Sequence, residues 1–401
     1  MELGPIFRAM VRNRARFVLV VLEVALTLAI VANCVGLILE ARAEMTRESG
    51  FVDDQLIWIR TTSFSPDHQD ETFVEMIHDR DVAALRAIPG VAEASATYFL
   101  PWQGGGSSGE VLIEGTEMER VRTQTYPADP RIWETLGVEL VSGRNFDEAD
   151  MEADPEGGTF NVIVSQGLAD LLFPDSEALG QVLQFSADGD RFPIIGVFDP
   201  FYNPYGWPIE EYALFYAGEA TGAGGSSFLV RAEPGRVEQV FGELEETLLA
   251  VDAGRNFHVR TISEIRSSYH TSDRVLVGSL NVVMGLLLLV TCLGIVGITA
   301  FSVAERRRQI GTRRAFGARK RDIVRYFLLE NWIVTSIGVL LGGALAFGLN
   351  VWLVHSMDGR PLDPWIVAAG AVGLWLVGLA SALGPALRGA KVQPATATRT
   401  V

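Results

Sequence analysis

The sequence predicts a membrane α-helical protein with four transmembrane helices and a large α+β domain outside the membrane. Hydrophobic residues make up 48% of the 401 residues and charged residues only 20%, below the roughly 25% of typical soluble domains. The apolar residues gather in four runs, at 17–39, 275–303, 332–354 and 365–387. Each run exceeds the roughly 20 residues that cross a bilayer core and lacks the polar face of a soluble surface helix. The long polar stretch 44–273 supplies the domain.

The basic residues predict which parts of the chain share one side of the membrane. Arg and Lys favour the cytoplasmic ends of membrane helices. Here they gather in residues 1–16, after residue 387, and in 305–330, which has nine basic residues and three acidic ones. The stretch 44–273 instead carries 41 acidic and 14 basic residues. We therefore expect both termini in the cytoplasm and 44–273 outside. The net charge of −16 argues against nucleic-acid binding, which needs a basic surface.

The first apolar run could belong to a secretory signal peptide, because four arginines precede it and Ala41-Arg42-Ala43 follows it. A signal peptide has an apolar core of only about 7–15 residues. The run at 17–39 is longer, which favours an uncleaved signal anchor. Glu23 lies inside this run, where carboxylates are rare and often functional. Because Arg16 is only about two helical turns away, pairing with an arginine or reaching the headgroups would also explain Glu23.

The stretch 44–273 mixes strand and helix patterns. Amphipathic periodicity predicts helices over 67–88 and 235–251. Alternating or continuous apolar segments predict strands, at 55–61, 91–100, 110–115, 227–232 and 257–262. Two strand–helix–strand units thus flank a long middle part. We expect one split βαβ subdomain, formed by 51–115 and 226–265, and an inserted, strand-rich subdomain at 116–225.

No catalytic or metal-binding pattern stands out in this stretch. Carboxylates alternate over 147–156, but Pro155 and Asn161 occupy the positions where a calcium loop needs Gly and Glu, which favours a solvated acidic loop. The five histidines lack metal-ligand spacing. The aromatic stretch 198–216 is either a packed irregular loop or a partner-binding one. We expect no enzyme activity, metal or cofactor in this chain.

The basic segment 305–330 also contains apolar residues, among them Ile310, Ala315 and Phe316. It could be an amphipathic helix lying on anionic lipids, or a short helix that docks into a cytoplasmic protein. Gly311 and Gly317 predict a break into short helical pieces, which suits docking. The chain contains no G-x-x-x-x-G-K-[ST] phosphate loop, so we expect no P-loop ATP site.

Residues 305–318 read ERRRQIGTRRAFGA. This resembles the junction between transmembrane helices two and three of the MacB/FtsX-like ABC transporter permeases, which carry E-R-x-x-E-I-G-x-R-[RK]-A-[LM]-G-A there. Gln309 and Phe316 depart from that pattern. Other segments are similar to the family's periplasmic core domain and fourth helix: 143–146 with Asp150, 162–165, 172–174, 194–197 and 385–388. The tail at 396–399 is a weaker match.

The resemblance covers the whole chain and implies its division into three parts. Residues 1–43 would hold the cytoplasmic N-terminus and the first membrane helix, 44–273 the periplasmic core domain, and 274–401 the FtsX-like domain with the other three helices. It implies a permease subunit in the bacterial inner membrane. Cytoplasmic ABC ATPase subunits would bind ATP and Mg²⁺, a second permease chain would complete a homo- or heterodimer, and a periplasmic adaptor could join.

The resemblance also implies that residues 305–321 form the coupling helix that contacts the ATPase. Its arginines would be solvated or meet acidic ATPase groups, while Ile310, Ala315 and Phe316 would fill a groove of the ATPase. The residues assigned to this contact are Glu305, Arg307, Arg308, Ile310, Gly311, Arg313, Arg314, Ala315, Phe316, Gly317 and Ala318.

The expected mechanism is mechanotransmission, in which ATP hydrolysis moves the external domain, for export or efflux. An FtsX-like regulatory protein, which passes the state of the ATPase to a periplasmic partner without moving cargo, is the alternative. A membrane-tethered binding domain without an ATPase is a third possibility, but it would not need the coupling motif.

Overall fold

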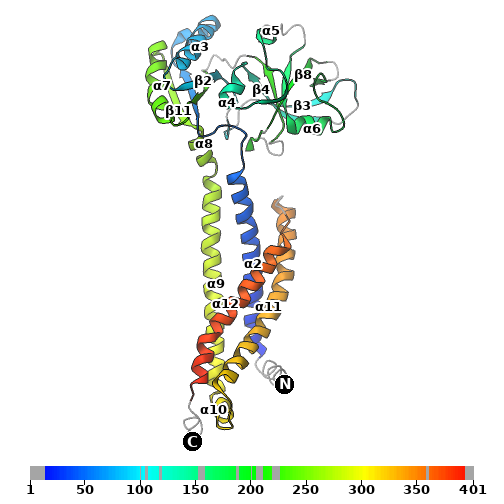
Figure 1. Ribbon diagram of the computed structural model, residues 1–401, viewed down its shortest axis with the longest axis vertical. Helices are drawn as coiled ribbons and strands as arrows, with labels where there is room; N and C mark the ends of the chain where they lie inside the picture. Colours follow the sequence, from blue (N-terminus) through cyan, green and yellow to red (C-terminus); the bar gives the residue numbers. More distant parts are fainter. Residues whose placement is uncertain are drawn as a thin grey trace. The chain divides into compact units, whose positions relative to one another are not determined.

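The computed structural model describes residues 14–99, 101–103, 107–116, 120–151, 159–186, 189–199, 201–204, 211–218, 226–357 and 361–392. They fall into two compact units (Figure 1). The membrane unit comprises the residues up to Thr46 together with those from Ser272 onward, and the α/β unit is Arg47–Thr271. Each unit is described by itself.

The described part of the membrane unit contains four helices that are long and apolar enough to cross a membrane. They are α2 (Arg14–Thr46), α9 (Thr271–Glu305), α11 (Lys320–Met357) and α12 (Pro364–Ala390). These helices confirm the four predicted runs, and each extends beyond its run at both ends. A short helix, α10 (Arg307–Ala315), connects α9 to α11.

Small residues let α11 approach α2 closely. A Cβ atom added to Gly338 would lie 2.8 Å from the Val24 side chain, and one added to Gly342 would lie 2.8 Å from the backbone oxygen of Ala25. Larger residues at these two positions would force the helices apart, which is the usual role of a G-x-x-x-G pair in membrane helices. Helix α9 is held to α2 by a 2.8 Å hydrogen bond between the hydroxyls of Thr27 and Thr291.

The α/β unit contains a four-stranded antiparallel sheet with the order β11-β1-β10-β2. Its strands are β1 (Leu56–Ser63), β2 (Val91–Ala96), β10 (Ser227–Ala232) and β11 (Arg255–Thr261). Helix α3 (Glu71–Arg86) connects β1 to β2, and α7 (Val237–Val251) connects β10 to β11. In each βαβ unit a strand of the other unit lies between the two strands. This is the predicted split βαβ arrangement.

Both faces of this sheet are buried, which explains why β1 begins with four consecutive apolar residues, 56–59. Ile57 and Ile59 pack with residues of α3 and α7, such as Leu85 and Leu244. Leu56 and Trp58, on the opposite face, belong to a core shared with the second sheet. Because successive side chains of a strand point to opposite faces, alternate residues of β1 belong to two different cores.

The second sheet has seven strands in the order β5-β8-β6-β9-β4-β3-β7, and β7 also pairs with β8, so that six of the strands close into a ring. The strands are β3 (Ser107–Ile113), β4 (Val121–Ala128), β5 (Leu140–Gly143), β6 (Val162–Ser165), β7 (Val182–Gln184), β8 (Arg191–Phe198) and β9 (Ala213–Ala217). Short helices lie between strands: α4 (Ile132–Leu136), α5 (Glu148–Met151) and α6 (Gln166–Leu172). A last helix of the unit, α8 (Ile262–Tyr269), precedes α9.

One expectation for this unit needs correction, and the structure favours one of two alternatives left open for the aromatic stretch. The boundary between the subdomains was expected after residue 115, but β3 pairs with β4 and β7, so the second sheet begins at Ser107. The alternation in this segment predicts a strand but does not say which sheet it joins. In the aromatic stretch 198–216, Phe198, Phe201 and Phe215 are buried in the core, which supports the packed interpretation; residues 200 and 205–210 lie outside the described residues.

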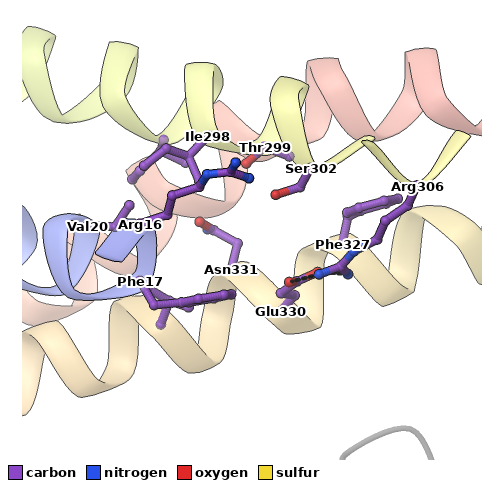
Figure 2. Close-up of a pocket in the computed structure, with 12 residues that line it drawn as sticks. Arg16, Phe17, Val20, Ile298, Thr299, Ser302, Arg306, Phe327, Glu330 and Asn331 are labelled. Atoms are coloured by element: carbon purple, nitrogen blue, oxygen red, sulfur yellow. Dashed lines mark hydrogen bonds and ion pairs between the residues drawn. The ribbon is translucent and has the colours of Figure 1, made fainter. Parts of the chain in front are cut away.

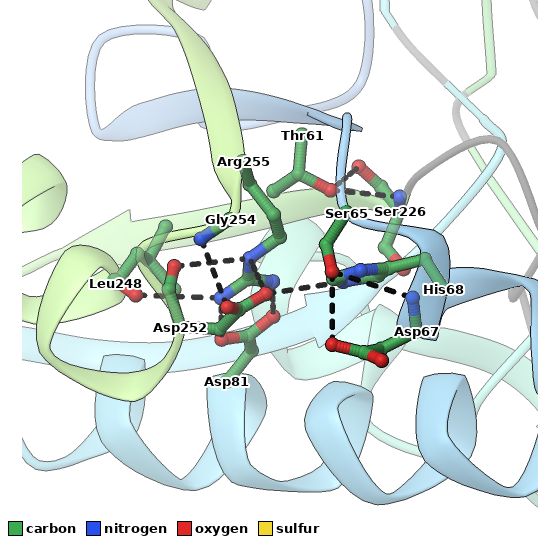
Figure 3. Close-up of polar contacts among 10 residues, drawn as sticks. All are labelled: Thr61, Ser65, Asp67, His68, Asp81, Ser226, Leu248, Asp252, Gly254 and Arg255. Atoms are coloured by element: carbon green, nitrogen blue, oxygen red, sulfur yellow. Dashed lines mark hydrogen bonds and ion pairs between the residues drawn. The ribbon is translucent and has the colours of Figure 1, made fainter.

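A buried charge cluster ties α3 to the end of α7 and the start of β11 (Figure 3). The Arg255 guanidinium makes two hydrogen bonds to Asp81, and both side chains are at most 2% exposed. Asp252 adds a second carboxylate 3.2 Å from Arg255, and it also lies 3.1 Å from His68. Burial raises the pKa of Asp81, so the arginine is what keeps this carboxyl charged.

We expect Asp81→Asn to lower the free energy of unfolding by about 3–5 kcal/mol, because it leaves a buried guanidinium without its main counter-charge. Unfolding of the full chain in detergent, followed by tryptophan fluorescence, measures this loss. The matched control is Glu233→Gln, which breaks an ion pair with Arg236 that is about half exposed. The control should change stability by less than about 1 kcal/mol, and an equal loss in both variants would contradict the assignment.

Asp150 is another buried carboxylate of this unit, and the expectation of a solvated acidic loop is wrong for it. Arg144 donates to both its oxygens, at 2.6 and 3.1 Å, and Asn161 and the backbone N–H of Asp147 donate as well. Burial alone would raise the pKa of Asp150, but these hydrogen bonds lower it to about 2. Residues 152–158 of the acidic stretch lie outside the described residues.

The lowered pKa of Asp150 predicts an acid-sensitive contribution to stability. A carboxyl whose pKa is lower in the folded than in the unfolded state stabilises the fold above its unfolded pKa, near 4, and loses this effect as the pH falls toward 2. We expect the wild type to exceed Asp150→Asn in stability by about 1–2 kcal/mol at pH 5.5, allowing for the partly exposed arginine. The difference should shrink at pH 2.5. A difference that stays constant between these pH values would refute the ion-pair explanation.

Candidate functional site

The turn from α9 to α11 forms a compact helical projection at one end of the membrane unit. Helix α9 ends at Glu305, and Arg306 leaves helical geometry with φ −97° and ψ 13° before α10 begins. Gly317, with φ 95°, ends the projection in the left-handed conformation that glycine adopts without strain. The prediction that Gly317 interrupts the helix is confirmed. The same prediction for Gly311 is wrong, because Gly311 lies inside α10.

Helix α10 is anchored to the bundle by Ile310. Ile310 is buried and packs with Ile323 and Phe327 of α11 and with Ala386 of α12. The expectation that Ile310 fills a groove of another protein is therefore wrong. Gly311 is buried as well. These two residues pack α10 against the bundle and are not available for contact with another protein.

The other assigned residues lie at or near the surface of the projection. Phe316 is 88% exposed, which is exceptional for a phenylalanine. Arg307, Arg308, Arg313, Ala315 and Gly317 are also exposed, and Ala318 is half-buried. Arg314 is half-buried and donates to the backbone oxygen of Val392, at 2.5 Å, so it ties α10 to the end of α12. The projection thus combines an exposed aromatic ring with three exposed guanidinium groups.

Behind the projection, a buried ion pair fixes the start of the turn (Figure 2). Arg306 donates to both carboxylate oxygens of Glu330, at 2.9 and 3.1 Å, and to the Tyr326 hydroxyl at 2.8 Å. The side chains of Arg306 and Glu330 are only 14% and 7% exposed. A bidentate arginine–carboxylate pair restricts orientation as well as distance. The pair therefore fixes the break after α9 relative to α11.

Arg306, Tyr326 and Glu330 were not among the residues predicted for this site. The available signal was Glu330 itself, one of three acidic residues in 305–330 and the one nearest the apolar run. Helical spacing places residue 326 one turn before residue 330, on the same face of α11. Nothing in the sequence, however, says which of the nine basic residues reaches that face.

Glu305 is engaged within this chain, on the opposite side of the break. Arg16 of α2 donates to its carboxylate at 3.0 Å, and the guanidinium of Arg16 also stacks on the Phe301 ring, 3.8 Å from its centre. This pair is partly exposed and contributes less than about 1 kcal/mol. It links α2 to the end of α9. A cavity of about 40 Å³ between Arg16, Ser302, Arg306 and Asn331 is large enough for one or two water molecules.

Glu23 does not pair with an arginine in the described part of the chain. Its carboxylate lies against α9 at Gly294, where an added Cβ atom would come within 2.4 Å of it. One carboxylate oxygen is buried without a hydrogen-bond partner among the described residues. Arg16, the partner that the sequence suggested, interacts with Glu305 instead. Gly294 thus provides the space that the Glu23 side chain occupies.

The α/β unit has its own polar junction, where its first and last segments meet. We call Asp53, Trp102 and Arg266 the Asp53 joint. Asp53 accepts hydrogen bonds from the Trp102 indole at 2.9 Å and from Arg266 of α8 at 3.0 Å. Arg266 also donates to the backbone oxygen of Arg47, at 2.8 Å, and lies over the Trp102 ring. Burial raises the pKa of Asp53, and the Trp102 and Arg266 contacts counteract this effect.

Trp102 holds a strained backbone at this joint. Its φ of 66° places it in the left-handed region, which bulky residues rarely adopt and which costs about 1–3 kcal/mol. The side chain is 1% exposed and touches the rings of Tyr202, Tyr269 and His270. The segment that follows α2 and the helix that precedes α9 are therefore locked to one buried side chain.

In the described residues, no group of three or more His, Cys, Asp or Glu could hold a metal ion. The structure instead offers an exposed projection at α10 for contact with another protein. Two buried ion pairs, Arg255–Asp81 and Arg306–Glu330, stiffen helix and strand ends. The Asp53 joint connects the two ends of the α/β unit.

Comparison with known families and proteins gives a consistent result. The family model of the MacB-like periplasmic core domain matches residues 17–247, and that of the FtsX-like permease C-terminal region matches 281–394. The macrolide export ATP-binding/permease protein MacB 1/2 of Paracoccus denitrificans is 30% identical over 325 residues, which are 79% of this chain and 46% of that protein. The chain thus spans somewhat less than half of that relative's length.

Two further similarities cover the chain differently. The ABC transporter permease YknZ of Bacillus subtilis is 25% identical over 82% of this chain and 80% of its own length. The crystal structure of the periplasmic region of MacB from Actinobacillus actinomycetemcomitans covers 57% of this chain and 98% of that structure, with 14% identity and a TM-score of 0.37.

Glu330→Gln should destabilise the membrane unit by about 3–5 kcal/mol, because Arg306 keeps its charge in a site that water barely reaches. Thermal unfolding in detergent, followed by circular dichroism, measures the loss. The matched control Glu305→Gln breaks the partly exposed pair with Arg16 and should cost less than about 1 kcal/mol.

The double variant Arg306→Leu/Glu330→Leu should recover most of the stability that Glu330→Gln loses, since replacing both charges leaves neither one unpaired. If the double variant were as unstable as the single one, packing around residue 330 and not the ion pair would be the cause.

Proposed function

Because this chain belongs to the MacB/FtsX-like family of ABC transporter permeases, we propose that it is the permease subunit of a transporter driven by separate cytoplasmic ATPase subunits. In this proposal two permease chains pair in the bacterial inner membrane, with both termini in the cytoplasm and the α/β unit outside. ATP and Mg²⁺ are bound by the ATPase, and this chain has no enzyme activity. The names of the macrolide-export relatives favour export or efflux.

The projection at α10 is the observation that supports this function. Phe316 is 88% exposed and shares the projection with three exposed arginines. Leaving so large an apolar ring in water is unfavourable, whereas a ring of this kind is common at the centre of a protein–protein contact. The aromatic ring would enter a pocket of the ATPase, and Arg307, Arg308 and Arg313 would meet its acidic groups. Ile310 and the Arg306–Glu330 pair belong to the support behind this contact.

The same contacts suggest how a push on α10 would reach the membrane helices. Ile310 packs on α11 and α12, and Arg306 joins the end of α9 to Glu330 of α11. A displacement of α10 therefore acts on α9 and α11 together, because a buried bidentate pair resists rotation and stretching. We propose that this rigidity makes the permease a mechanical transmitter.

The Asp53 joint would allow movements of α2 and α9 to be passed to the α/β unit. Helix α8 ends at Tyr269, and α9 begins at Thr271, so the chain passes from one to the other with a single residue between them. Arg266 of α8 is fixed to Asp53 and to the backbone of Arg47, the residue that follows α2 by one position in the chain. A movement of either helix end would thus reach both ends of the α/β unit at once.

A regulatory function is the second candidate. The same transmission could inform a periplasmic partner of the state of the ATPase without moving any cargo, as in the FtsX-like alternative. A periplasmic adaptor and either a homo- or a heterodimer of permease chains are compatible with both functions.

We expect Phe316→Asp to abolish retention of the ATPase when the full chain is purified in detergent, because it removes the ring and adds a charge that opposes docking. The retained amount of an ABC-type ATPase, identified by mass spectrometry, is the measurement. The matched control is Phe64→Asp, since Phe64 is also exposed but belongs to the α/β unit. The control should retain the ATPase fully.

Two results would contradict the proposal. If wild-type chain retains no ATPase under these conditions, the permease assignment loses its basis and the tethered binding domain becomes the better account. If Phe316→Asp and wild type retain equal amounts, the projection is not the docking surface.

A further inference from the structure

A groove with a basic mouth and apolar walls runs between α11 and α12, on a face that the function proposed above does not use. Its volume is about 850 Å³, within the range of ligand pockets, about 300–1,000 Å³. Four cations line one end: Lys320, Arg321, Arg325 and Lys391. The walls are apolar and include Leu328, Trp332, Leu379 and Leu387. We call this the basic groove.

The dimensions of the basic groove match one leaflet of a bilayer. On α11 it extends from Lys320 to Trp332, and on α12 from Lys391 back to Leu379. At 1.5 Å per helical residue each wall is roughly 18 Å long. One leaflet contributes about half of the roughly 30 Å hydrocarbon core. The charged mouth thus lies at headgroup level when the walls lie at acyl-chain level.

The charges at the mouth select the type of lipid. No acidic residue lines the groove in the described part of the chain, so the four cations face no carboxylate there. Asp322 lies 3.9 Å from Arg321 on the same helix, and both side chains are exposed. Each Lys or Arg near an anionic membrane surface contributes about 1 kcal/mol of attraction. A lipid with a net negative headgroup would neutralise the cations at this mouth. The headgroup of a zwitterionic lipid also carries a positive charge, which these cations would repel.

We infer that the basic groove binds one anionic phospholipid, with the phosphate at Lys320, Arg325 and Lys391 and an acyl chain along Leu328 and Leu387. Because the walls are apolar at membrane depth, the occupant must be apolar over the same length, which an inorganic anion is not. The lipid would hold the first turns of α11 to the last turn of α12. Lys320 and Arg321 fall at the end of the range 305–321 that was expected to contact the ATPase, but Phe316, the residue proposed to enter the ATPase, does not line the groove.

The test compares two lipids with identical acyl chains on the full chain purified without an ATPase. Native mass spectrometry counts molecules of dioleoyl phosphatidylglycerol or dioleoyl phosphatidylcholine that stay bound. We expect wild type to retain phosphatidylglycerol roughly tenfold better than phosphatidylcholine. Two cations that each contribute about 1 kcal/mol of attraction would produce a preference of tenfold or more. Equal retention of the two lipids would overturn the proposal.

Variants separate the mouth from general surface charge. Arg325→Gln/Lys391→Gln should bring retention of the two lipids close to parity. The matched control Arg307→Gln/Arg308→Gln removes the same charge from α10, outside the groove, and should keep the preference within about twofold. If both double variants lose the preference equally, the attraction is general and the groove is not a site.

Two further arms identify the occupant. Leu387→Trp narrows the apolar wall and keeps all four cations, so it should release the lipid, and unchanged retention would overturn the acyl-chain contact. Glycerol 3-phosphate in millimolar excess should not displace the lipid. If it does, the mouth is an anion site only and the lipid proposal fails. Because the comparison of lipids uses the wild type, a variant that fails to fold does not leave the proposal undecided.

Discussion

The ion pair between Arg306 and Glu330 is the constraint on which the functional end of the membrane unit depends. It lies where α9 stops and the chain turns, and it connects that break to α11 by two hydrogen bonds. Two charges this deeply buried are stable only together. The direction of the break is therefore fixed, and with it the direction of α10. Ile310 of α10 anchors this helix to the bundle, and Phe316, directly after its end, stays exposed.

The sequence predicted the parts of this protein that are determined locally. A run of more than 20 apolar residues is a property of one segment, so all four membrane helices could be recognised, and the strand and helix patterns of the split βαβ subdomain could be read in the same way. The sheet to which β3 belongs could not be predicted, since the two-residue alternation of a strand does not depend on which strand it pairs with. The partner strands β4 and β7 settle that question from other parts of the chain.

The candidate site shows the same limit more sharply. Ile310 and Phe316 are both apolar residues of one motif, and the sequence assigned both to an external partner. Ile310 is buried beside Ala386, a small residue more than seventy positions further along, whereas Phe316 follows the end of α10 and is 88% exposed. Similarly, an arginine such as Arg16 was one of the partners considered for Glu23, but Arg16 pairs with Glu305 on α9. Contacts between distant segments, and not residue type, decide which side chain faces inward.

The first turns of α11 show how one helical segment can serve several purposes without conflict. Ile323 and Phe327 face α10, while Tyr326 and Glu330 face Arg306. Arg321, Arg325 and Leu328 line the basic groove toward α12. Spacings of three and four residues keep each set on its own face of the helix. A lipid in the groove would then press α11 from the side opposite to the ion pair, so the two contacts together would limit how far this helix end can tilt. Stiffness at this point matters most in a protein whose proposed task is to carry displacement from one end of its helices to the other.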